Sequence, residues 1–123
     1  MRDEDTTVAQ LKQRMAEFIA VRDWGKYHRP RNLAMSIAIE AAELMEHFQW
    51  ATDQEAEAVL RDEQSRKQVT EEATDILAFV LSLANCLNVD LASSFEEKMR
   101  KNELKYPAEE VRGHYERPKK DDV

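Results

Sequence analysis

Apolar side chains recur every three or four positions along most of the chain, which is the spacing of one face of an α-helix. This pattern predicts an all-α protein with four main helices. They are expected at residues 6–23, 30–50, 66–88 and 91–105. Between the second and the third of them, the highly charged segment 54–63 is expected to form a surface helix or a loop.

The predicted helix boundaries depend on capping residues, whose side-chain oxygens accept free backbone N–H groups. Thr6 or Thr7 can cap the first helix, Ser65 the third and Asp90 the fourth. Pro30 suits the first turn of the second helix, because a missing N–H costs nothing there.

The same spacing predicts the core when residues are placed about 100° apart around each helix axis. On the second helix, the apolar stripe contains Leu33, Ala34, Ile37, Ala41, Leu44, Met45 and Phe48. On the third helix, it contains Val69, Ala73, Ile76, Val80, Leu83 and Leu87. The two helices are joined by a short segment, so we expect them to pack antiparallel through these stripes.

Two carboxylate pairs lie within these helices, Glu40 with Glu43 and Glu72 with Asp75. The members of each pair are three residues apart, so they share a helix face, and each pair lies on the flank of its apolar stripe. On adjacent helices the four carboxylates would meet, and a divalent cation is the simplest way to offset their repulsion. The spacing alone leaves open whether the pairs bind a metal or are ordinary solvated faces.

The type of ligand narrows the choice of metal. Oxygen ligands favour Mg²⁺, with Mn²⁺ as a substitute, over zinc. A di-iron centre would require two Glu-x-x-His motifs, whereas His47 follows Glu43 by four residues and the third helix contains no His. The sequence therefore disfavours a di-iron protein.

Further side chains are candidates for ligand contacts, and each has an ordinary structural alternative. Trp24 and Trp50 are expected near helix ends, where they can stack on a base or anchor the core or a subunit interface. His28 can contact a phosphate or stabilise the connector between helices. Lys98 and Asn102, four residues apart on one helix face, can contact a polyphosphate or remain solvated.

Composition excludes several classes of function. The formal net charge of the 123-residue chain is −7, which argues against a partner nucleic acid. With two glycines, the chain has no glycine-rich phosphate loop. A single cysteine, no signal peptide and no bilayer-length apolar run favour a cytoplasmic protein without a membrane partner. We expect one domain at 1–112 and a charged, disordered tail at 113–123.

Several of these residues occur in motifs that resemble the MazG-like nucleotide pyrophosphohydrolases, and most of all their dCTP pyrophosphatase branch. The resemblance extends from about Leu11 to Pro107. The motifs are Arg22-Asp-Trp24, His28-x-Pro30-Arg31-Asn32-Leu33, Glu40-Ala-Ala-Glu43-Leu44, Phe48-Gln-Trp50, Glu72-x-x-Asp75-Ile76, Lys98-Met-x-x-Asn102 and Tyr106-Pro107.

The resemblance implies an all-α fold whose helical bundle is completed in a homodimer or homotetramer. It implies Mg²⁺-dependent hydrolysis of a nucleoside triphosphate substrate to the monophosphate and pyrophosphate. The biological role is left open between nucleotide pool cleansing and a phage- or stress-related role. By this similarity, Glu40 and Glu43 are catalytic, and the metal ligands are Glu40, Glu43, Glu72 and Asp75. The implied substrate contacts are Trp24, His28, Arg31, Trp50, Lys98 and Asn102.

The sequence departs from the family pattern at a few positions around the site. Ile39 and Ala42 stand where many relatives have Gly, Phe79 where some have Tyr, and Met15 where some have His. These changes leave the carboxylates intact and affect the choice of base and sugar. We expect the substrate to be dCTP or a modified pyrimidine dNTP. The alternatives are the same chemistry on dUTP or noncanonical purine nucleotides, and a non-catalytic dimeric helical adaptor.

Overall fold

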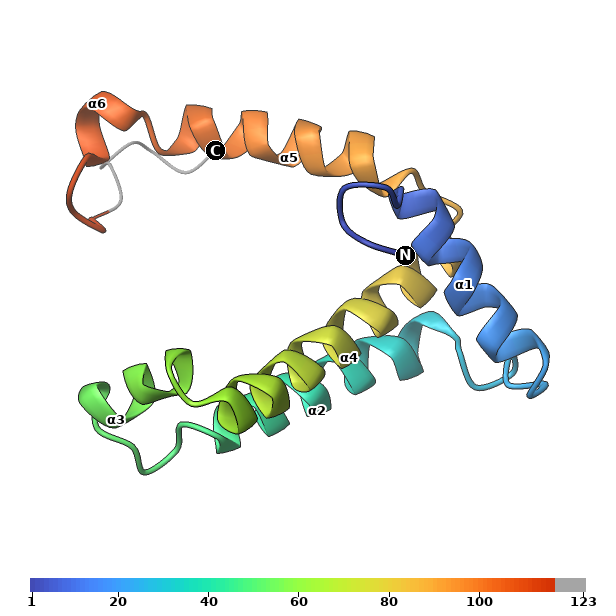
Figure 1. Cartoon of the computed structure of the whole chain (residues 1–123). Helices are drawn as coiled ribbons and strands as arrows, with labels where there is room; N and C mark the ends of the chain where they lie inside the picture. The colour runs from blue at the N-terminus through green and yellow to red at the C-terminus, as the bar shows by residue number, and fades with distance from the viewer. Residues whose placement is uncertain (117–123) are drawn as a thin grey trace. The chain divides into compact units, whose positions relative to one another are not determined.

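The computed structural model describes residues 1–116, and these residues contain helices and no strands. The all-α prediction is therefore confirmed for the described part of the chain (Figure 1). The helices are α1 (Val8–Ala20), α2 (Pro30–Glu46), α3 (Asp53–Glu57), the 3₁₀ helix η1 (Ala58–Leu60), α4 (Glu63–Leu87), α5 (Leu91–Lys105) and α6 (Ala108–Val111).

Several predicted boundaries are corrected by the structure. The second helix ends at Glu46, four residues before Trp50. The predicted third helix, which is α4, begins at Glu63 because Asp62, rather than Ser65, is its N-cap. The Asp62 carboxylate accepts the backbone N–H of Ser65 at 2.9 Å. Thr7 caps α1 as predicted and forms a reciprocal pair of hydrogen bonds with Gln10.

The chain forms two compact units that divide after Asn88. In the first unit, α2 and α4 run antiparallel side by side, as predicted (Figure 1). Helix α1 packs on α4, where the side-chain amide of Asn85 donates to the backbone carbonyl of Lys12 at 2.9 Å. Helix α4 therefore supports both α1 and α2.

The core of this unit is small. The buried apolar side chains among the described residues are Ile19, Leu33, Leu81 and Ala84. Leu33 belongs to the predicted stripe of α2, but Leu81 and Ala84 lie outside the predicted stripe of α4. They are buried because α1 also packs on α4. A helical wheel drawn for α4 alone does not assign that face of the helix to the core. The predicted core residue Met45 is instead 70% exposed.

The second unit begins at Val89 and contains α5 and α6. Asp90 is the N-cap of α5, as predicted, and accepts the backbone N–H of Ser93 at 3.0 Å. The short helix α6 was not predicted. The expected single domain at 1–112 stays a prediction, and residues 117–123 of the expected tail lie outside the described residues.

Within the described residues, no single helix is long and apolar enough to cross a membrane. Helices α4 and α5 meet the criterion only when they are counted together as a bent pair, by length and composition alone.

Candidate functional site

The antiparallel packing of α2 and α4 brings together three of the four predicted carboxylates. One oxygen each from Glu40, Glu43 and Glu72 lies within 4.8 Å of the other two. Asp75 is not part of this group, although its negative charge acts on Glu40. Glu40 and Glu72 are half-buried and Glu43 is exposed. The arrangement is an acidic cluster that is open to solvent on one side.

Glu40 carries the strongest electrostatic perturbation in the cluster. Loss of hydration raises the pKa of Glu40 to about 7, with further contributions from a hydrogen bond to Glu43 and from the charges of Glu43, Asp75 and Glu72. Its Oε2 atom is buried and has no hydrogen-bond partner. A buried carboxylate oxygen without a donor is costly, and a cation would satisfy it. The residues present therefore fit a divalent metal that prefers oxygen ligands.

His47 contacts this cluster from the end of α2. Its Nε2 atom lies 3.5 Å from Oε1 of Glu72, and the two side chains are 26% and 22% exposed. The helical spacing predicts that His47 lies on the same flank as Glu40 and Glu43, but the contact with Glu72 was not predicted. His47 follows Glu43 by four residues, but whether it reaches Glu72 depends on how α2 ends and on the packing of α4.

His28 lies in the connector before α2 and contacts α4 at two points. Its Nδ1 atom is 3.0 Å from the hydroxyl oxygen of Ser82, and its ring stacks on Phe79 at 6.1 Å between centroids. Burial lowers the pKa of His28. Phe79 follows Asp75 by four residues on α4, so the His28 ring lies next to the acidic flank of that helix. Arg31, in the first turn of α2, is exposed.

The two tryptophans have different environments. Trp24 is 42% exposed and packs edge to face on Phe18, with 6.0 Å between ring centroids. The Arg22 guanidinium lies over the same Phe18 ring at 3.8 Å. Trp50, beyond the end of α2, is 92% exposed. Trp50 therefore does not anchor the core of this chain.

The remaining predicted contacts, Lys98 and Asn102, lie on α5 in the second unit. Lys98 is exposed and Asn102 is half-buried. The roles of these two residues, and those of the predicted residues in the first unit, stay predictions.

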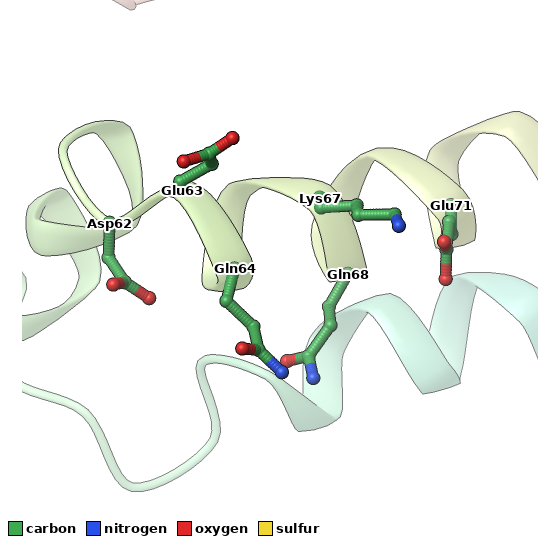
Figure 2. Close-up of a pocket in the computed structure, with 6 residues that line it drawn as sticks. All are labelled: Asp62, Glu63, Gln64, Lys67, Gln68 and Glu71. Atoms are coloured by element: carbon green, nitrogen blue, oxygen red, sulfur yellow. The ribbon is translucent and has the colours of Figure 1, made fainter.

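A hollow lies at the beginning of α4, and none of the predicted site residues lines it. Its volume is about 630 Å³, and Figure 2 shows its lining side chains, Asp62, Glu63, Gln64, Lys67, Gln68 and Glu71. Three of these are acidic and one is basic, so the hollow does not favour a polyphosphate. The carboxylate cluster remains the better candidate for chemistry.

Comparisons with known proteins agree with this fold. The sequence pattern of the MazG-like family matches residues 35–118. The crystal structure of a pyrophosphatase from Archaeoglobus fulgidus superposes with a TM-score of 0.73 and 38% identity, covering 87% of this chain and 98% of that one.

Vertebrate relatives include dCTP pyrophosphatase 1 of Rattus norvegicus, which is 36% identical over 109 residues, or 89% of this chain. The protein of the same name from Homo sapiens is 38% identical over 104 residues, or 85% of this chain. The chain spans 64% of the length of the rat protein and 61% of the human one. The family match and the likeness to the archaeal structure show that this chain belongs to the MazG-like family.

Proposed function

We propose that this protein is a Mg²⁺-dependent nucleoside triphosphate pyrophosphohydrolase. Its substrate would be dCTP or a modified pyrimidine dNTP, and its products the monophosphate and pyrophosphate. The observation that carries the proposal is the approach of the Glu40, Glu43 and Glu72 oxygens to within 4.8 Å of one another. Support comes from the relatives named dCTP pyrophosphatase 1 and from the archaeal pyrophosphatase.

The four carboxylates have different tasks in this proposal. Glu40, Glu43, Glu72 and Asp75 hold Mg²⁺, for which Mn²⁺ can substitute. When bound, the cation offsets the charge of the triphosphate and makes a water molecule more acidic. Glu40 or Glu43 takes the proton of the attacking water. We favour Glu43, because it is the exposed member of the pair and can reach a water molecule in the open part of the cluster.

The nucleotide would be held by side chains around the cluster. The exposed rings of Trp24 and Trp50 offer faces on which a base can stack. His28 and Arg31 lie beside the beginning of α2 and would contact the sugar or a phosphate. Lys98 and Asn102 on α5 are the further residues proposed to contact phosphate or sugar.

We also propose that the protein assembles as a homodimer or homotetramer. Large apolar side chains on the two site-bearing helices are exposed in the single chain, among them Ile39 at 58% and Leu77 at 45%. Burying such surface against another copy is favourable. A cytoplasmic location and a role in cleansing the nucleotide pool belong to the same proposal.

The first experiment is a panel of dNTPs, modified pyrimidine nucleotides and noncanonical purine nucleotides, assayed for pyrophosphate release with and without Mg²⁺. We expect Mg²⁺-dependent release, fastest with dCTP or a modified cytidine nucleotide. The matched variant is Glu43→Gln, which keeps the shape of the side chain and removes its charge. It should abolish pyrophosphate release, while its circular dichroism spectrum stays helical. Near-normal activity of this variant at saturating Mg²⁺ would refute the assignment of the site.

The same panel decides between substrates. Faster hydrolysis of dUTP or of a noncanonical purine nucleotide would keep the chemistry and change the base, because base choice depends on a few contacts in the pocket.

A non-catalytic helical adaptor is the second candidate function, and the exposed apolar side chains favour it. An adaptor should show no nucleotide binding that depends on Mg²⁺, which isothermal titration calorimetry measures directly.

A further inference from the structure

His47 connects the end of α2 to the acidic flank of α4. It follows Glu46, the last residue of α2, and its ring Nε2 lies 3.5 Å from Oε1 of Glu72. A carboxylate oxygen only accepts hydrogen bonds, so this contact requires a hydrogen on Nε2. The two side chains are 26% and 22% exposed.

Glu72 is the α4 member of the carboxylate cluster. Its partners in the cluster, Glu40 and Glu43, both come from α2. The orientation of the Glu72 carboxylate therefore decides whether Glu72 offers an oxygen to the same point as the two α2 carboxylates. His47 contacts Oε1, one of the two oxygens of this carboxylate.

We propose that His47 is a positioning residue, which fixes the Glu72 carboxylate in the orientation that a divalent cation requires. The inference rests on the proposed metal site, and it concerns a residue outside the ligand set. Ligating carboxylates are commonly held by a second hydrogen bond, and losing such a partner weakens metal binding about 10- to 100-fold.

The test measures Mg²⁺ binding by isothermal titration calorimetry on the full chain without nucleotide. In His47→Leu, which keeps bulk and removes the donor, we expect Mg²⁺ affinity to fall by about tenfold or more. In His47→Gln, the amide Nε2 reaches a similar position and still donates, so affinity should remain within about threefold of the unmodified protein. Circular dichroism and thermal unfolding check that each variant is folded.

A neighbouring surface position provides the control. Gln49 is exposed and lies two residues beyond His47, so Gln49→Leu introduces the same side chain without touching Glu72. This variant should bind Mg²⁺ normally.

The possible outcomes separate the inference from the function on which it rests. No Mg²⁺ binding by the unmodified protein would overturn the metal site, and the inference with it. Equal affinity of the unmodified protein and His47→Leu would overturn the inference alone, as would a His47→Gln variant as weak as His47→Leu. A loss in His47→Leu that is much larger for Mn²⁺ than for Mg²⁺ would also overturn it, since it would make His47 a nitrogen ligand.

Discussion

We expect the proposed Mg²⁺ binding to depend on pH, because the pKa of Glu40 is raised. Dehydration and the neighbouring carboxylates raise this pKa to about 7 in the metal-free protein. A cation competes with the proton for the same carboxylate. The fraction of protein with an ionised Glu40 is about one in eleven at pH 6 and about ten in eleven at pH 8. We therefore expect the apparent affinity for Mg²⁺ to rise about tenfold between these two pH values.

Calorimetry can measure both the affinity for Mg²⁺ and the number of protons released when Mg²⁺ binds. At pH 7, binding should release roughly half a proton per Mg²⁺, which is found by repeating the titration in buffers with different ionisation enthalpies. The control is Glu40→Gln, which has no proton to lose. It should bind more weakly and with little pH dependence. A change in affinity below about twofold between pH 6 and pH 8, or the same proton release from Glu40→Gln, would refute the reasoning.

The raised pKa of Glu40 also determines how the stability of the metal-free protein changes with pH. The pKa of Glu40 is raised from 4.5 to about 7 on folding, so the folded chain retains a proton that the unfolded chain loses. The contribution of Glu40 to stability is fully present below about pH 4.5 and is lost as the pH rises through about 7. The thermal midpoint of the metal-free protein should therefore fall between pH 5 and pH 8, relative to Glu40→Gln. Mg²⁺ should reverse the loss at pH 8, because it binds the ionised form.

Four further predictions follow from single contacts or exposures. Asp75→Asn should abolish Mg²⁺-dependent pyrophosphate release without loss of helical circular dichroism; activity that survives at saturating Mg²⁺ would remove Asp75 from the proposed ligands. Trp50→Ala should raise KM more than it lowers kcat if the ring stacks on a base. It should change the free energy of unfolding by less than about 0.5 kcal/mol, because Trp50 is 92% exposed. An unfolded variant would contradict a stacking role. Ser82→Ala should lower the free energy of unfolding, measured in urea, by about 1 kcal/mol. The reason is that it removes the hydroxyl that lies 3.0 Å from Nδ1 of His28. No change would mean that this hydrogen bond contributes nothing to stability. Ile39→Lys, at a side chain that is 58% exposed, should shift the protein toward monomers in light scattering; an unchanged mass would exclude that face from the interface.

The sequence was sufficient for the features that depend on local spacing. A three-residue separation places Glu40 and Glu43 on one face of α2 whatever the rest of the fold does. The short connection between α2 and α4 favours antiparallel packing, which the structure confirms (Figure 1). These two facts explain why Glu72 meets the α2 pair.

Features that depend on a third element were not predictable from the helical wheels. Leu81 and Ala84 are buried because α1 covers that face of α4, and no periodicity within α4 indicates where α1 will lie. The contact between His47 and Glu72 likewise depends on how α2 ends, since His47 follows the last residue of the helix. A helical wheel for residues 30–50 assumes that the helix continues to Trp50, whereas α2 ends at Glu46. The position that the wheel gives to Trp50 is therefore wrong.

The exposed apolar surface and the acidic cluster are physically linked, because both belong to α2 and α4. A chain of this size usually buries a larger core than the four apolar side chains buried among the described residues. If another copy covers Ile39 and its neighbours, it removes further water from α2. Loss of hydration is already the largest cause of the raised pKa of Glu40. Assembly should therefore raise this pKa further, and the midpoint of pH-dependent Mg²⁺ binding should move up as the protein concentration increases.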